Sequence, residues 1–139
     1  MKPLLGVFGL TDSTVEIHEI GLTRVIESLT ARGYSVERSS SRETPDLQIM
    51  SPRGNKFWVN CRNVTQKGFT WFISRLDETT RPFYILTYAP VKSNIDPVEF
   101  WILDFDEAKQ FVSSFGGSEP QGNDKRFREH YERWEKLPR

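Results

Sequence analysis

Residues 45–62 read PDLQIMSPRGNKFWVNCR, a stretch that predicts two β-strands joined by a short turn. The middle of the stretch, Ser51–Asn55, contains Pro, Gly and Asn, which favour turns. It separates two candidate strands, Asp46–Met50 and Lys56–Arg62. A connection of this length is too short for a crossover, so we expect the two strands to pair antiparallel.

A long helix is predicted upstream of this hairpin. The residues Thr11–Ser13 favour a helix start, and Ser13 with Glu16 has the spacing of a capping box. Gly33 stands where a left-handed residue would end the helix. Gly21 is expected to weaken the middle of the helix by about 1 kcal/mol relative to Ala. Apolar residues recur at helical spacing along one face: Val15, Leu22, Val25, Ile26 and Leu29.

The other predicted elements complete a mixed sheet flanked by helices. In chain order we expect a strand at Tyr34–Arg38, a helix at Gln66–Glu78, a strand at Phe83–Tyr88, a loop at Pro90–Pro97, a strand at Val98–Leu103, a helix from Asp104 to about Phe115, and a charged helix at about 124–137. The order is helix, three strands, helix, two strands, then helices, which predicts an α/β sandwich. We expect one domain over 1–139, with its core at about 13–115.

The composition is that of a globular protein. Of the 139 residues, 37% are hydrophobic and 27% are charged. No apolar run approaches the roughly 20 residues that span a bilayer, and no signal peptide is evident, so we expect a cytoplasmic protein without a membrane role. A single cysteine, Cys61, cannot form an internal disulfide, and its place in a strand predicts a buried, inert thiol.

The formal net charge is zero, but the charges are unevenly distributed. Residues 1–75 carry ten Lys or Arg against seven Asp or Glu, whereas residues 76–139 carry nine against twelve. The first half can therefore form a basic face, or its cations can be scattered over a solvated surface. The candidate members of this face are Arg24, Arg32, Arg38, Arg42, Arg53, Lys56, Arg62 and Lys67.

One region of the sequence resembles a known family. A helix followed by Pro45-Asp46, a hairpin and a strand with Asn60-Cys61-Arg62 is similar to the core of PD-(D/E)xK proteins, which include restriction endonucleases and Holliday-junction resolvases. The resemblance covers roughly residues 13–112. It implies a restriction-endonuclease-like mixed-sheet αβα sandwich. The family pattern is a Glu on the helix, an Asp after Pro on a strand, and Asp/Glu/Gln-x-Lys on the next strand.

The chemistry of the family explains these residue types. Phosphodiester cleavage uses a divalent cation that activates water and neutralises developing charge. Mg²⁺ prefers carboxylate oxygens and waters as ligands, and a nearby Lys stabilises the transition state. Carried onto this sequence, Asp46 is the first metal-binding acid, and Glu16 or Glu19 is the acid on the helix. Asp46 and Asn60 would then be the residues that hold Mg²⁺.

Two positions depart from the family pattern. Asn60 replaces an acid or Gln and offers only a neutral carbonyl oxygen. Arg62 replaces Lys; it can bind a phosphate bidentately, but it is a poor proton-transfer group. Losing one such catalytic group typically costs about 10²–10³ in rate, so we expect impaired catalysis. Lys56 is the one nearby lysine that could take over the missing role.

Several structural interpretations of these residues stay open. Asp46 can simply start a strand, Glu16 can be only a capping acid, and Arg62 can be a surface residue. His18 and His130 are far apart in sequence, and with one cysteine they form no metal-binding spacing. His18 is therefore expected to be a residue of the helix surface.

Three functions remain open at this point. The first is a nuclease-fold protein with impaired catalysis that binds nucleic acid or serves as a partner subunit. The residues proposed to contact DNA are Arg42, Arg53, Lys56 and Lys67. The second is an active Mg²⁺-dependent phosphodiester hydrolase acting on DNA. The third is an immunity or regulatory module that binds protein, favoured by the neutral net charge and by the acids Glu129, Glu132 and Glu135 on the last expected helix.

Overall fold

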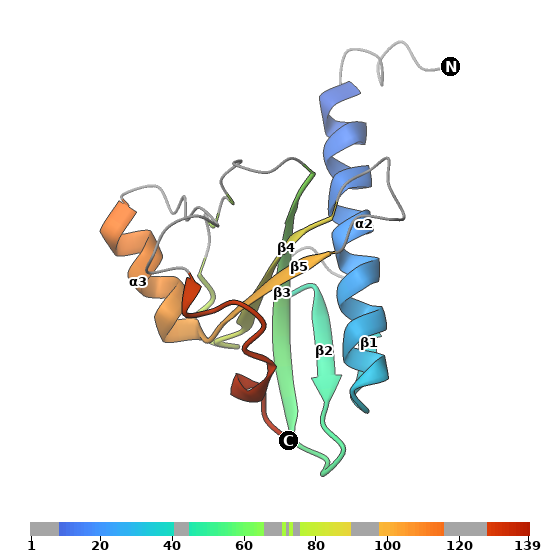
Figure 1. Ribbon diagram of the computed structural model, residues 1–139, viewed down its shortest axis with the longest axis vertical. Helices are drawn as coiled ribbons and strands as arrows, with labels where there is room; N and C mark the ends of the chain where they lie inside the picture. Colours follow the sequence, from blue (N-terminus) through green and yellow to red (C-terminus); the bar gives the residue numbers. More distant parts are fainter. Residues whose placement is uncertain are drawn as a thin grey trace.

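The computed structural model describes residues 9–40, 45–65, 71, 73, 76–89, 98–115 and 128–139. Over these residues the protein has an α/β fold with a five-stranded mixed sheet in the order β1-β2-β3-β4-β5 (Figure 1). The strands are β1 Ser35–Arg38, β2 Leu47–Met50, β3 Lys56–Val64, β4 Phe83–Tyr88 and β5 Glu99–Leu103. Only β3 and β4 pair in parallel; the other neighbours are antiparallel. The predicted hairpin and the predicted strands are confirmed.

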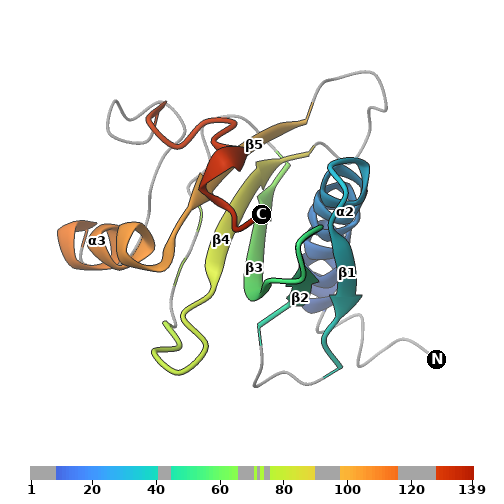
Figure 2. The ribbon, with the colours of Figure 1, turned by 90° about the horizontal axis from the view of Figure 1, so that it is seen from below.

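The two α-helices lie on opposite faces of the sheet. Helix α2, Gly9–Ala31, runs alongside β1, β2 and β3, and helix α3, Phe105–Phe115, lies on the other side near β4 and β5 (Figures 1 and 2). Alternate strand residues serve the two faces, as the pleat of a strand requires. On β4, for example, Ile85 packs in the core under α2, whereas Tyr84 and Leu86 pack in the second core with Ala108 of α3.

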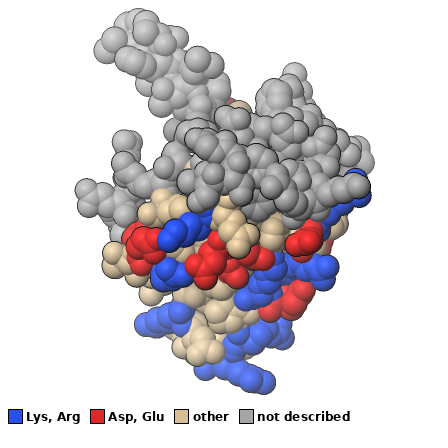
Figure 3. Space-filling view, turned by 90° about the vertical axis from the view of Figure 1, so that its left-hand side faces the viewer, with Lys and Arg blue, Asp and Glu red and all other residues tan. Residues whose placement is uncertain are grey.

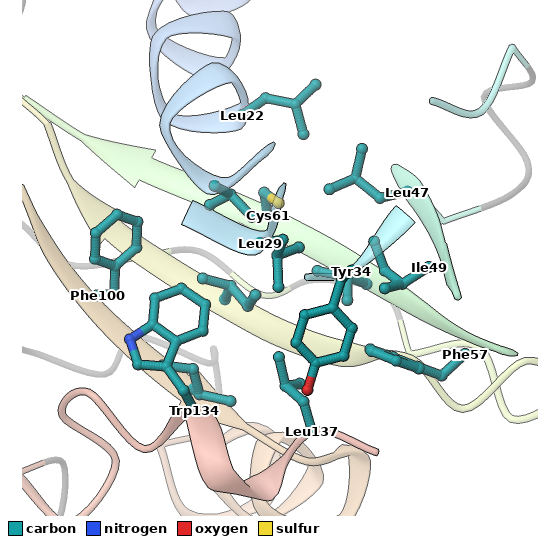
Figure 4. Close-up of a cluster of buried hydrophobic side chains, with 14 residues drawn as sticks. Leu22, Leu29, Tyr34, Leu47, Ile49, Phe57, Cys61, Phe100, Trp134 and Leu137 are labelled. Carbon is teal, nitrogen blue, oxygen red and sulfur yellow. The ribbon is translucent and has the colours of Figure 1, made fainter. Parts of the chain in front are cut away.

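Helix α2 follows the predicted apolar stripe, but it begins at Gly9, so Ser13 lies inside the helix and the predicted helix start with its capping box is wrong. Leu22, Val25 and Leu29 are fully or almost fully buried, and Figure 4 shows Leu22 and Leu29 above the sheet among the other core side chains. Gly33 has φ of +93°, and the N–H of Tyr34 donates to the carbonyl of Leu29, which closes the helix end. The predicted glycine C-cap is therefore confirmed.

Gly21 has a packing role that its helix propensity does not reveal. A Cβ at this position would overlap the Cβ of Asn63 and lie 2.8 Å from the hydroxyl of Thr87. The missing side chain thus allows α2 to approach β3 and β4 closely. The predicted propensity cost of glycine is offset by this contact.

The predicted C-terminal helix is wrong for the described residues from 129 onward. Glu132 has φ of 55°, which interrupts a right-handed helix. The backbone instead pairs with β5: the Ile102 N–H donates to the His130 carbonyl, and the Glu132 N–H donates to the Phe100 carbonyl. A short 3₁₀-helix, η1 (Trp134–Lys136), follows. The charged segment therefore forms an extra edge against β5 rather than a helix.

The same segment carries apolar side chains into the core. Trp134 and Leu137 are 7% and 1% exposed, and both belong to the core cluster beneath α2 (Figure 4). The core thus extends beyond the predicted limit at residue 115. Residues 124–127 of the predicted helix lie outside the described part of the chain.

The predicted helix at Gln66–Glu78 falls mostly on residues that are not described, namely 66–70, 72, 74 and 75. Its described residues Trp71, Ile73, Leu76 and Asp77 are not helical. Trp71 and Ile73, two positions apart, are both buried in the core on the α3 side, a spacing typical of extended chain. The loop at Pro90–Pro97 also lies outside the described residues.

Candidate functional site

The candidate site lies where β2 and β3 begin to separate. Asp46 immediately precedes β2 and stands across from Asn60 of β3. Its N–H donates to the Asn60 Oδ1 at 2.9 Å, and its Oδ2 accepts from the Cys61 N–H at 2.8 Å. Side-chain oxygens of Asn60 and Asp46 thus accept the hydrogen bonds that backbone carbonyls would accept in a continued β2–β3 pairing. The Asp46 carboxylate is therefore held by the backbone of the neighbouring strand.

Two nitrogen-bearing side chains lie on either side of this carboxylate. The Nε2 of His18, on α2, is 3.5 Å from the Asp46 Oδ1, and the Nη1 of Arg62, on β3, is 3.5 Å from the Asp46 Oδ2. The same Arg62 nitrogen donates to the Cys61 carbonyl at 2.7 Å. The three side chains are 24–32% exposed. The structure thus brings together Asp46, Asn60 and Arg62, and it adds His18.

The electrostatics of the site keep Asp46 ionised. Burial alone would raise the pKa of this carboxyl. Hydrogen bonds from His18 and from the Cys61 N–H, together with the nearby positive charge of Arg62, outweigh burial and hold the pKa below its usual value. Cys61 behaves in the opposite way, because its complete burial raises the pKa of the thiol well above normal. Cys61 is therefore the buried, inert thiol that the sequence predicts.

The two candidate acids of the helix are not equivalent. Glu19 accepts two hydrogen bonds from the Nη2 of Arg38, at 2.6 and 2.7 Å, and is thereby engaged by a cation. Glu16 is exposed on α2, and within the described residues it has no ion-pair or hydrogen-bond partner. Neither acid joins Asp46 in a shared cluster.

The residues present do not fit a magnesium site as they are arranged. Mg²⁺ requires several free oxygen ligands. The Asn60 Oδ1 already accepts a hydrogen bond, and both Asp46 oxygens face nitrogen donors. Among the residues that the structure describes, no three His, Cys, Asp or Glu side chains gather as metal ligands.

Comparisons with known proteins add no assignment. No family model matches the chain, and neither the curated proteins nor the solved structures contain a match. Function therefore has to be argued from the residues themselves. Within the described part of the chain, no helix combines the length and the apolar character needed to cross a bilayer.

The residues predicted to contact DNA are only partly described. Arg42 and Lys67 lie outside the described residues. Arg53 and Lys56 are exposed at the β2–β3 turn, and neither forms an ion pair with a described residue. The Asn55 side chain lies 3.5 Å from the carbonyl of Arg139, which brings the C-terminus to the same end of the molecule.

Fewer cations of the predicted basic face lack an acidic partner than the sequence suggests. Arg24 pairs with Glu27 and Arg38 with Glu19, while the Arg32 guanidinium lies 4.3 Å from the Trp134 ring. Figure 3 shows Lys and Arg predominating on the lower part of the face in view, with both charges mixed in the band above. The cations free of acids are thus concentrated toward the hairpin end.

Two contributors to the site region were missed from the sequence. His18 lies four residues before Leu22 and so continues the buried stripe of α2, a spacing that could have placed it toward the sheet. Asn63 links three elements: its Nδ2 donates to the Ile17 carbonyl at 3.0 Å, and its Oδ1 accepts from the Thr87 hydroxyl at 2.7 Å and from the Ala89 N–H at 3.0 Å. No local sequence pattern predicts such a long-range clamp.

Proposed function

We propose that this chain has a PD-(D/E)xK nuclease-like fold and binds nucleic acid without cleaving it efficiently. The topology supports the first part of the proposal. A long helix precedes three antiparallel strands, and β4 then joins β3 in parallel. Asp46 at the start of β2 stands beside positions 60 and 62 of β3, next to the opening helix, which is the relative placement that the family resemblance implies.

The contacts of the Asp46 carboxylate support the proposal that cleavage is inefficient. Both oxygens of the Asp46 carboxylate face nitrogen donors, from His18 on one side and from Arg62 and the Cys61 N–H on the other. A divalent cation would have to displace these donors and would be repelled by the Arg62 charge. Metal-activated attack on a phosphodiester therefore has little support here.

Arg62 is suited to bind a phosphate. Its guanidinium meets Asp46 at 3.5 Å through one nitrogen, which is looser than a bidentate pair, and its side chain is 31% exposed. A phosphate can offer the two parallel hydrogen bonds that Asp46 does not. Lys56 lies on the same face of β3, because residues 56 and 62 are an even number of positions apart. Together with Arg53 in the adjoining turn, this face of β3 presents three cations to an anionic backbone.

Binding is tested by fluorescence anisotropy with a labelled oligonucleotide in EDTA, over a series of salt concentrations. Three phosphate contacts predict a log–log slope of about −2 for a single strand, since each contact contributes roughly −0.7. Lys56→Gln should make the slope shallower. Lys109→Gln is the matched control, because Lys109 is an exposed lysine of α3 that already pairs with Glu78. Absence of binding at low salt would refute the proposed function.

The other two functions have less support in the described residues. An active endonuclease needs a free carboxylate cluster, and none gathers among the described residues. A protein-binding acidic helix would need Glu129, Glu132 and Glu135 on one helical surface. The segment is not helical there, and Glu132 instead accepts a hydrogen bond from the Trp134 indole.

A further inference from the structure

Strand β3 presents a polar and aromatic row on the face turned away from α2. Phe57, Val59 and Cys61 pack into the core cluster that contains the α2 side chains. Because successive strand residues point to opposite faces, Lys56, Trp58, Asn60 and Arg62 project from the other face. One strand thus carries an indole with a cation on each side of it.

Trp58 differs from the other three tryptophans of the chain. Trp71, Trp101 and Trp134 are 2%, 6% and 7% exposed, and each packs against another aromatic ring. Trp58 is only partly buried, and among the described residues its side chain has neither a ring contact nor a hydrogen bond. The exposed part of its indole is therefore available to a ligand.

The surroundings of Trp58 form an open part of the sheet. Gln48 of β2 lies directly opposite Trp58, and Met50, which is 40% exposed, lies opposite Lys56. A groove of about 320 Å³ lies over β1 and β2; Gln48, Met50 and Lys56 line it together with Ser35 and Glu37, and Trp58 lies next to it along β3. Helix α3 packs on β4 and β5, and it lies away from β1 and β2 in both Figure 1 and Figure 2. Within the described chain, no helix covers this part of the face.

We propose that this face binds single-stranded nucleic acid, with a base stacked on Trp58 and the flanking phosphates held by Lys56 and Arg62. The proposal rests on the proposed nucleic-acid binding and adds the class of ligand. Stacking of a base on an aromatic side chain contributes about 1–3 kcal/mol and tolerates any base. A duplex keeps its bases paired and stacked inside, so the indole cannot reach them.

Charge complementarity sets the path of the strand. Lys56 and Arg62 lie about 7 and 13 Å from Trp58 along β3, at the usual rise of a strand. Arg53 adds a cation at the hairpin end, whereas Glu37 on β1 places a carboxylate at the groove. A polyanion is therefore expected to follow β3 rather than to cross toward β1.

The test compares one oligonucleotide sequence as a single strand and as a duplex, by anisotropy without metal. The wild type should bind the single strand more tightly. Trp58→Leu should weaken single-strand binding by about 5- to 100-fold, while Trp58→Phe, which keeps a stacking ring, should lose less. Tyr131→Leu is the matched control: it removes an exposed aromatic side chain of the C-terminal segment, away from this part of the face, and should bind as the wild type does. Thermal melting checks that each variant folds.

A spectroscopic readout makes the test specific to stacking. Binding of the single strand should quench tryptophan fluorescence in the wild type, and Trp58→Phe should remove that quenching. Equal affinity for single strand and duplex, or unchanged affinity in Trp58→Leu, would overturn this inference while leaving nucleic-acid binding intact. A wild type that binds neither form removes the proposed function itself. A dimer that dissociates in Trp58→Leu would show that the face instead binds a second copy.

Discussion

Two clusters in this protein each combine a carboxylate, a histidine and a basic side chain, and they differ in the length of the contacts between these groups. In one, Asp46 lies between His18 and Arg62 at 3.5 Å on each side. In the other, Glu107 of α3 lies near His130 and Lys136 of the C-terminal segment. The Lys136 Nζ is 2.9 and 3.0 Å from the two Glu107 oxygens and 2.7 Å from the His130 Nδ1.

The second cluster, here called the closed cluster, is joined by short hydrogen bonds, whereas the Asp46 cluster is the open one. Glu107 and Lys136 are nevertheless 28% and 21% exposed. Lys136 also donates to the Ile102 carbonyl at 3.0 Å, and Glu107 exchanges hydrogen bonds with Asp104 as a capping box at the start of α3. The His130 side chain is 7% exposed. These contacts connect α3, β5 and the C-terminal segment, so the cluster is a structural clamp.

The difference in contact length indicates that the Glu107 cluster stabilises the fold, whereas the Asp46 cluster is suited to bind a ligand. Around Glu107 the donors and acceptors meet at short distances, so removing one partner would leave a charge without its hydrogen bonds. Around Asp46 the two ion-pair contacts are 3.5 Å long, while the side chains are about as exposed as Glu107 and Lys136. Arg62 can therefore offer its other guanidinium nitrogen atoms to a phosphate while Nη1 keeps its hydrogen bond to the Cys61 carbonyl. Changes in the first cluster should affect binding, and changes in the second should affect stability.

The largest expected effect is on stability, at the closed cluster. Glu107→Ala leaves Lys136 facing His130 and removes the capping box, and it should lower the free energy of unfolding by about 2–3 kcal/mol. Asp106→Ala is the control on the same helix, since Asp106 is exposed and pairs only at the surface with Arg81. Urea unfolding measures both. Equal losses in the two variants would mean that Glu107 is not part of a clamp.

A second effect is a pH dependence that comes from His130. Burial and the Lys136 charge lower the pKa of this imidazole below its ordinary value, despite the opposing charges of Glu107, Glu129 and Asp104. The unfolded chain then binds the proton more strongly, so stability is complete above about pH 6.5 and falls as the pH drops below it. The slope for one proton is at most about 1.4 kcal/mol per pH unit.

The two clusters should lose their contributions to stability at different pH values. The Asp46 carboxyl has a lowered pKa, so its contribution to stability is lost only as the pH falls below about 3.9, the ordinary value of an aspartate. The stability change that comes from His130 should therefore fall between pH 7 and 5. His130→Gln should flatten the pH dependence of unfolding in this range; an unchanged slope in His130→Gln would contradict the assignment of the closed cluster.

The smallest expected effect is on binding, at the open cluster. Asp46→Asn removes a negative charge beside Arg62 and should tighten single-strand binding by about 2- to 5-fold, as removal of one partly screened charge allows. The substitution should lower the free energy of unfolding by about 1 kcal/mol, because the Cys61 N–H would then donate to a neutral amide oxygen instead of a carboxylate. Anisotropy gives the binding change. Weaker binding in Asp46→Asn would show that the carboxylate itself contributes to the ligand site.

The sequence predicts well the features that depend on local patterns. Helix α2, the β2–β3 hairpin and the glycine end at Gly33 follow from periodicity and turn residues. The last segment was predicted wrongly because its charged residues have helical spacing, whereas backbone bonds to β5 and burial of Trp134 determine its path. His18 was missed because its partner, Asp46, lies in a distant strand. The closeness of Asn60 and Arg62 to Asp46 was anticipated only through the family resemblance.

In our proposal, nitrogen donors hold Asp46 in a site that binds nucleic acid and does not cut it. The most direct measurement incubates the wild type and Asp46→Ala with labelled single-stranded, duplex and branched DNA in Mg²⁺, Mn²⁺ or EDTA, and separates the products on a denaturing gel. We expect no metal-dependent product that distinguishes the two proteins. Cleavage by the wild type that Asp46→Ala abolishes would contradict the claim and identify a working nuclease.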